Sequence, residues 1–174
     1  MRWLLAAVLG AAALPASAQG YYEWSFNRYV AASPLDTILT LAYGVPNSGD
    51  LQAFISCAIG ANWIYAEVRL EADIEAYPDR ARVPMTLSGE GFYRVVDVDI
   101  ERQEEGIWGV AFALPLDDPF WNDIEGHYEI YYALPGGIET PLLIEGLLPL
   151  VGQFRHDCAG ILDLVPDQAP TPGK

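Results

Sequence analysis

Apolar and polar positions alternate most regularly along residues 64–75. The apolar positions of this segment are Ile64, Ala66, Val68, Leu70, Ala72 and Ile74. The positions between them, mostly charged, are Tyr65, Glu67, Arg69, Glu71, Asp73 and Glu75. Successive side chains of a β-strand point to opposite faces, so this pattern predicts a long strand with one buried and one solvated face. A helix, turning about 100° per residue, would spread the charged residues round its whole circumference.

Similar patterns predict further strands separated by turns that are rich in glycine, proline and asparagine. These strands span residues 21–28, 37–44, 51–59, 83–88, 91–101, 106–114, 127–134 and 138–144, the last interrupted by Pro141. An acidic residue followed by a proline predicts the start of a short helix at Asp118 and Pro119. A change to helical spacing predicts a final helix over residues 146–158, with an apolar stripe of Leu147, Leu148, Val151, Phe154 and Cys158.

Together these elements predict a mainly β domain. We expect an antiparallel sandwich or a partly open barrel of about eight strands, with one short helix and a C-terminal helix. Cys57 lies on the apolar side of the predicted strand 51–59, and Cys158 lies on the apolar stripe of the final helix. A disulfide between Cys57 and Cys158 would fasten that helix to the sheet. Closing a loop of about 100 residues contributes roughly 4–5 kcal/mol in the chain-entropy model.

The first 18 residues have the three parts of a signal peptide. Arg2 supplies a positive charge, residues 3–14 are apolar, and residues 16–18 (Ala-Ser-Ala) match the small-residue pattern of a cleavage site. The alternative is an N-terminal anchor or a buried helix, but a dozen apolar residues is short for a bilayer core of roughly 30 Å. We expect cleavage after Ala18 and a periplasmic or secreted protein. The mature chain then comprises a single β-rich domain over residues 19–164 and a disordered proline-rich tail over residues 165–174.

The charge of the chain narrows the choice of partner. Without residues 1–18 the sequence holds 8 basic and 24 acidic residues, a formal charge of −16. This charge repels phosphate backbones, so we expect no nucleic-acid partner. A cationic protein or peptide is the partner that fits best, although acidity also serves solubility alone. We expect no transmembrane segment in the mature chain, and the sequence leaves the oligomeric state open.

No motif of a known catalytic chemistry is present in the sequence. The two histidines are His127 and His156, and neither belongs to an HExxH motif; CxxC, GxSxG and phosphate-loop patterns are also absent. We therefore expect a protein without enzymatic activity. The alternative is a hydrolase that uses scattered Asp and Glu residues, since a pair of carboxylates at a suitable separation is easily found among 24.

Three acidic residues form a candidate cation site. Asp97, Asp99 and Glu101 share one face of the predicted strand 91–101. A similar row on the strand 64–75 consists of Glu67, Glu71, Asp73 and Glu75. If these strands were neighbours, the like charges would repel, and Ca²⁺ could relieve the repulsion. The simpler interpretation is two solvated faces with Arg69 and Arg94 as counter-charges, and no cofactor.

Aromatic residues provide the second set of candidates. Trp24, Trp63, Tyr65 and Tyr131 are close in sequence to acidic residues, and aromatic faces beside carboxylates can bind cationic peptides or glycans. Alternatively, these side chains pack the interior of the domain.

The segments LAYGVPNSGDLQAFISCA, GIWGVAFAL and DDPFW, together with the final helix carrying Cys158, resemble an uncharacterised family of small exported alphaproteobacterial proteins. The resemblance spans most of residues 36–160 and implies a bacterial periplasmic setting, with no activity or ligand attached to it. We expect an acidic, non-enzymatic binding or envelope-interaction module. A structural accessory subunit is a further alternative, which an exposed apolar edge or patch would favour.

Overall fold

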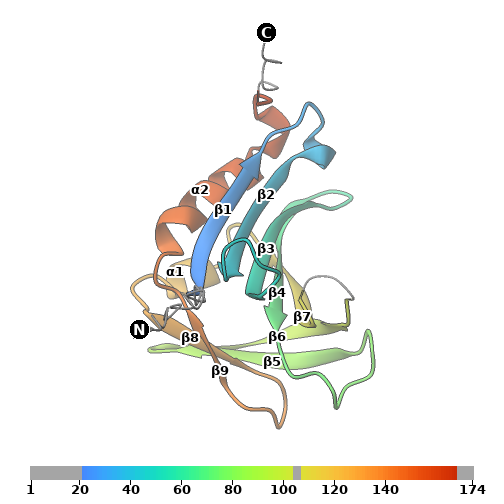
Figure 1. Ribbon diagram of the computed structural model, residues 1–174, viewed down its shortest axis with the longest axis vertical. Helices are drawn as coiled ribbons and strands as arrows, with labels where there is room; N and C mark the ends of the chain where they lie inside the picture. Colours follow the sequence, from blue (N-terminus) through green and yellow to red (C-terminus); the bar gives the residue numbers. More distant parts are fainter. Residues whose placement is uncertain (1–20, 104–106, 168–174) are drawn as a thin grey trace, which may run out of the picture.

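The nine strands of the described residues form one continuous antiparallel sheet that curls into a half-barrel (Figure 1). The computed structural model describes residues 21–103 and 107–167. The strand order is β1-β2-β3-β4-β7-β6-β5-β8-β9. The strands are β1 (Glu23–Tyr29), β2 (Ile38–Gly44), β3 (Leu51–Ile59), β4 (Ile64–Glu71), β5 (Arg82–Gly89), β6 (Phe92–Glu101), β7 (Gly109–Pro115), β8 (Glu129–Ala133) and β9 (Thr140–Leu143).

The alternation in the sequence decides which side chains line the concave face. Across the centre of the sheet, Val68 of β4 lies opposite Phe112 of β7, and Ile100 of β6 lies opposite Val110. All four are buried. The helices α1 (Phe120–Asp123) and α2 (Leu148–Ala159) supply Phe120, Trp121, Val151 and Phe154 to the same core.

Side chains join the two edges of the curled sheet. The indole Nε1 of Trp24 on β1 donates a hydrogen bond of 2.7 Å to the carbonyl of Leu143 on β9. Gln52 on β3 donates through Nε2 to the carbonyl of Pro141, at 2.6 Å. Proline has no N–H to leave unpaired at a strand edge, so Pro141 is compatible with this position. These two bonds pair carbonyls of β9, one edge strand of the described sheet, with side chains of β1, the opposite edge strand, and of the interior strand β3.

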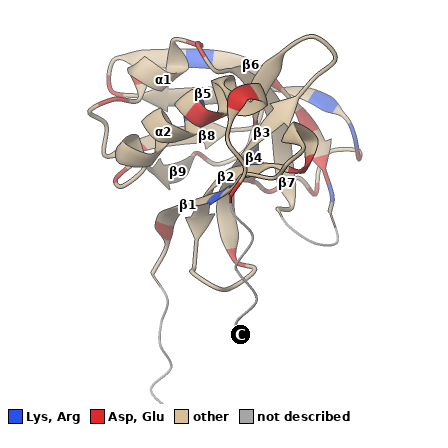
Figure 2. Cartoon of the chain, turned by 90° about the horizontal axis from the view of Figure 1, so that it is seen from above, with Lys and Arg blue, Asp and Glu red and all other residues tan. Residues whose placement is uncertain are grey.

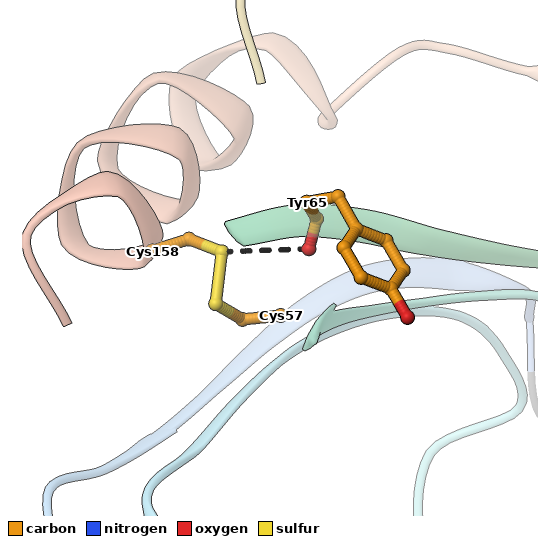
Figure 3. The surroundings of a disulfide bond; sticks show 3 residues. All are labelled: Cys57, Tyr65 and Cys158. Atoms are coloured by element: carbon orange, nitrogen blue, oxygen red, sulfur yellow. Dashed lines mark hydrogen bonds between the residues drawn. A yellow bond between two sulfur atoms is a disulfide. The ribbon is translucent and has the colours of Figure 1, made fainter. Parts of the chain in front are cut away.

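Helix α2 is fixed to the strands by a covalent bond and an ion pair. Cys158 on α2 is bonded to Cys57 on β3 across 101 residues of sequence, as the sequence predicts (Figure 3). Its sulfur lies 3.8 Å from the carbonyl oxygen of Tyr65 on β4, a contact without a hydrogen bond because a disulfide sulfur carries no proton. Asp157 accepts a hydrogen bond of 2.7 Å from Nε of Arg28 on β1.

The structure confirms the predicted fold class and changes some boundaries. The strand expected over residues 64–75 ends at Glu71. Beyond it, the carboxylate of Asp73 accepts the backbone N–H of Glu75, and Ile74 is turned fully into the core. Side-chain capture of a nearby N–H by aspartate is typical of a turn, and here it competes successfully with strand pairing.

Several predicted segments fall wholly or partly outside the described residues. The predicted signal peptide, residues 1–18, is outside them, as are residues 168–174 of the predicted disordered tail. At the start of that tail, Asp167 donates its N–H to the carbonyl of Val30 at 2.9 Å, and its carboxylate accepts the N–H of Val30 at 2.8 Å. Asp167, which lies in the predicted tail, is therefore hydrogen-bonded to the residue that follows β1. Within the described part of the chain, no helix is long and apolar enough to span a membrane.

Removing the bridge tests its contribution to stability. We expect the Cys57→Ala/Cys158→Ala variant to keep its β-sheet circular dichroism and to lose up to about 4–5 kcal/mol of unfolding free energy. The reason is that the unfolded chain has more conformational entropy without the bridge than with it. Urea denaturation measures the loss. The control is wild-type protein with its disulfide reduced, which separates the effect of losing the covalent bond from the effect of removing the two sulfur atoms. Equal stability of the oxidised and reduced proteins would contradict this interpretation.

Acid should weaken the attachment of α2. Burial alone would raise the pKa of the Asp157 carboxyl, but Arg28, assisted by His156, holds that pKa below its usual value of 3.8. A carboxyl whose pKa is lower in the folded state than in the unfolded state stabilises the fold at any pH above its unfolded-state pKa. This stabilisation is lost as the pH falls through the folded-state pKa. We expect unfolding free energy to fall as pH drops below about 4. In Asp157→Asn the decrease should be smaller; an identical pH dependence in urea titrations would refute this role.

Candidate functional site

An open trough lies at the end of the half-barrel where β4 ends and β8 turns into β9. Two adjoining hollows, of about 610 and 630 Å³, share Ala72, Asp73, Tyr132 and Thr140. One wall is the segment after β4, residues 72–77, and the other is the β8–β9 connection. Figure 1 shows these two loops at the lower end of the molecule. The side chains that line the trough include Glu71, Asp73, Glu75, Tyr77, Trp108, Tyr132, Leu134, Pro135, Ile138 and Thr140.

A close approach of two strands places Trp108 beside the acidic wall. A Cβ atom on Gly109 would come within 2.0 Å of the carbonyl oxygen of Leu70 and 2.7 Å of the Ala72 nitrogen, so this position requires glycine. The carbonyl of Trp108 accepts the N–H of Ala72 at 3.3 Å. The Trp108 side chain, 49% exposed, therefore borders the same hollow as Asp73.

The side chain of Arg102, close to the trough, is already engaged. Its Nη2 donates hydrogen bonds of 2.7 and 2.5 Å to the carbonyls of Ile74 and Tyr77, and its guanidinium carbon lies 5.7 Å from the centre of the Trp108 ring. These contacts brace the acidic wall and cover part of the indole. Arg102 makes its ion-pair contact with Asp79, at 4.0 Å, and not with a carboxylate of the trough.

Tyr132 forms a rigid part of the trough floor. It is 2% exposed, and its hydroxyl donates a hydrogen bond of 2.6 Å to the carbonyl of Glu71. Burial, together with the negative charge of Glu71, raises the pKa of Tyr132 to about 12, although Gln52 opposes the rise. The phenol therefore stays neutral over the physiological range. Tyr77 connects the two walls by donating to the carbonyl of Pro135 at 2.8 Å.

The carboxylates at the trough have no basic partner in the described part of the chain. Within residues 21–103 and 107–167, Glu71, Asp73 and Glu75 take part in no ion pair. All three are exposed. By contrast, on the convex face Arg69 pairs with Glu67 at 2.6 Å and with Glu101 at 3.2 Å. The trough therefore carries negative charge that the basic residues of the described chain do not compensate. Acidic residues outnumber basic ones in the molecule as a whole (Figure 2).

The negative field extends along the end of the barrel to β1. The hydroxyl of Tyr22 donates a hydrogen bond to the carboxylate of Asp50. This bond, with burial and the charges of Asp50 and Glu71, raises the pKa of Tyr22 to about 12. Several carboxylates beside aromatic and aliphatic surface form a site suited to a cation that also carries apolar groups.

The aromatic candidates from the sequence lie in different places. Trp24 is buried, 8% exposed, and its indole closes the sheet, so it has no face free for a ligand. Tyr131 lies on the convex face, where its hydroxyl donates to Glu129. Trp63 and Tyr65 stack on one another, with ring centres 4.1 Å apart, at the β3–β4 turn. That turn lies at the opposite end of β4 from the trough.

The candidate cation residues do not lie beside the second acidic row, as a shared Ca²⁺ site would require. Strand β7 separates β4 from β6, so the two acidic rows are not adjacent. The small residues Ala111 and Gly109 of β7 leave room for Arg69 to reach Glu101 across it. Asp97 and Asp99 are exposed, and Glu101 also accepts a hydrogen bond from Gln103 at 2.8 Å. No group of three or more metal-ligating side chains in the described residues could hold a metal ion.

The trough has no motif in the sequence. The alternation alone predicts that Glu71, Asp73 and Glu75 lie on the solvated face of a strand, and Trp108 falls in the apolar strand predicted over residues 106–114. The signal that could have identified the trough is Asp73, because an aspartate two residues before Glu75 favours a turn that would end the strand.

Comparisons with known proteins add little to this description. No family model matches the chain, and neither does a curated protein. Among solved structures, the chain is similar to invasion associated protein B from Bartonella henselae, with 14% sequence identity and a TM-score of 0.46. The match covers 77% of this chain and 95% of that one. Similarity at this level supports no inference about function.

Calcium provides a test of the convex face. We expect millimolar Ca²⁺ to leave the thermal midpoint of unfolding unchanged relative to chelator, because Glu101 already pairs with Arg69 and the carboxylates of Asp97 and Asp99 face water. Differential scanning calorimetry measures the midpoint. A Ca²⁺-dependent rise that disappears in Asp97→Asn/Asp99→Asn would show that these residues bind the ion after all.

Proposed function

We propose that this protein is an exported, non-enzymatic binding module whose acidic trough receives a cationic segment of a protein or peptide. The observation that carries the proposal is a set of three carboxylates, unpaired among the described residues, along a groove that also presents Trp108 and Ile138. They are Glu71, Asp73 and Glu75. A lysine or arginine side chain can place its charge near the carboxylates and its methylene groups on the apolar surface.

The arrangement of the trough favours recognition over a purely solvating role. Its walls are joined by the Tyr77–Pro135 hydrogen bond, and its floor is fixed by Tyr132. A site that is already rigid loses little conformational entropy when a ligand binds. Trp108 and Ile138 are 49% and 90% exposed, and exposed apolar residues beside charged groups are common in interaction sites.

An exported setting fits the same proposal. The Cys57–Cys158 disulfide is of the kind that persists in oxidising compartments, and the first 18 residues have the sequence pattern of a signal peptide. The rival hydrolase would need an acid–base or nucleophile–base pair within hydrogen-bond reach of a substrate. Among the lining residues, the carboxylates and the hydroxyls of Thr140, Tyr77 and Tyr132 are the groups that such a mechanism would have to use.

Titration with a lysine octapeptide tests the proposal, with a glycine–serine octapeptide as the neutral probe. We expect calorimetry at low ionic strength to detect binding of the lysine peptide alone, weakened by added salt. The Asp73→Asn/Glu75→Gln variant should bind about tenfold less tightly or worse, which corresponds to a loss of at least about 1.4 kcal/mol. The asparagine introduced at position 73 keeps a side-chain oxygen that can accept the backbone N–H of residue 75, so the turn should survive.

The matched control is Asp36→Asn/Asp163→Asn. It removes the same charge from exposed residues of the short helices η1 (Pro34–Asp36) and η2 (Ile161–Asp163), at the other end of the molecule (Figure 1). We expect its affinity for the lysine peptide to stay within about twofold of wild type. An equal loss in both variants would mean that net charge alone attracts the peptide and would overturn the proposal, as would the absence of binding to wild type.

A further inference from the structure

The end of the barrel opposite the trough exposes apolar side chains around a second groove. Antiparallel pairing brings the end of β1, the β3–β4 turn and the segment after α2 to this end (Figure 1). Trp63 is 48% exposed, Leu162 65% and Val165 82%. The groove, of about 690 Å³, is lined among others by Ile64, Trp63, Pro115, Leu116, Asp117 and Leu162.

Trp63 is held in a fixed position at this groove. Its ring stacks on Tyr65, and its Nε1 and Cδ1 atoms pack so closely on Gly60 that a Cβ there would lie 2.9 and 3.0 Å from them. The Gly60 N–H also donates to the carbonyl of Trp63 at 2.7 Å. A rigid, half-exposed indole is a favourable anchor because docking onto it costs little conformational entropy.

The described chain finishes at the same end of the barrel. Asp167 is held against Val30 by two hydrogen bonds and lies 3.6 Å from the Arg28 guanidinium. Val30 directly follows β1, and the Trp63 turn precedes β4. With neighbouring strands about 4.8 Å apart, three strand spacings separate these points by roughly 14 Å. Seven residues in an extended polyproline conformation span roughly 22 Å, so residues 168–174 are long enough to reach the groove.

The sequence of residues 168–174 complements the groove. It reads QAPTPGK, with prolines at 170 and 172 and the one lysine of the chain at 174. Proline-rich segments dock on aromatic-lined grooves because their restricted backbone loses little entropy on binding. The groove offers Trp63 to a proline ring. Its Asp117 is exposed and makes no ion pair among the described residues, which suits the charge of Lys174.

We propose that residues 168–174 dock intramolecularly in this groove, with a proline on Trp63 and Lys174 near Asp117. A tether raises the effective concentration of a segment to the millimolar range, so docking requires only a weak intrinsic affinity. The docked segment covers apolar surface at this end and leaves the acidic trough open to its ligand.

NMR of the tryptophan indole N–H groups tests the docking. The Trp63 signal is assigned by comparison with Trp63→Phe, and the predicted mature chain is compared with the same chain lacking residues 168–174. We expect the deletion to shift the Trp63 signal and to leave that of Trp108, at the other end, in place. Added QAPTPGK peptide at millimolar concentration should restore the shift. A Pro170→Ser/Pro172→Ser chain of full length should behave like the deletion.

Two results would overturn the proposal. One is an unchanged Trp63 signal after deletion. The other is a difference between the full and shortened chains that grows with protein concentration, since this dependence would mean that the segment binds a second molecule. A difference that is independent of concentration supports docking within one molecule.

Discussion

The structure depends on covering one apolar face of a nine-stranded sheet. Alternation places apolar residues of every strand on the concave side, and curling alone cannot hide them all from water. Helix α2 covers part of this face, held by the Cys57–Cys158 bond and by the Arg28–Asp157 pair. Because α2 runs along one side of the concave face, loops rather than a helix cover the two ends of the half-barrel. The two grooves lie among these loops.

The two ends differ in chemistry because of the loops that the strands need. At one end, Asp73 stops β4 and turns the chain so that Glu71, Asp73 and Glu75 gather without a basic partner among the described residues. At the other end, the tight β3–β4 turn presents Trp63 over Gly60. We infer that one end recognises a cation and the other holds the chain's own proline-rich segment. Arg102, beside the trough, is committed elsewhere, since it bonds to backbone carbonyls.

Much of the fold could be predicted from local pattern, because most strands alternate, the strand around β7 is a run of apolar residues, and the final helix changes the period. The bridge could also be predicted, since Cys57 and Cys158 both fall on apolar positions. The strand order could not, because the pairing of β7 between β4 and β6 is set by contacts far apart in sequence. The same limit applies to the site: Trp24 and Trp63 both follow acidic or polar neighbours, but only the fold buries one and exposes the other. The trough joins side chains from several distant segments, which no local motif records.

The central claim is that the trough carboxylates are kept for binding and not for stability. Crowded, unpaired like charges destabilise a fold, and binding sites commonly tolerate such a cost. The most direct measurement is the unfolding free energy of Glu71→Gln/Asp73→Asn/Glu75→Gln at low ionic strength, from urea denaturation. Our account predicts a protein more stable than wild type. A less stable protein would mean that these carboxylates support the structure, and it would contradict the account.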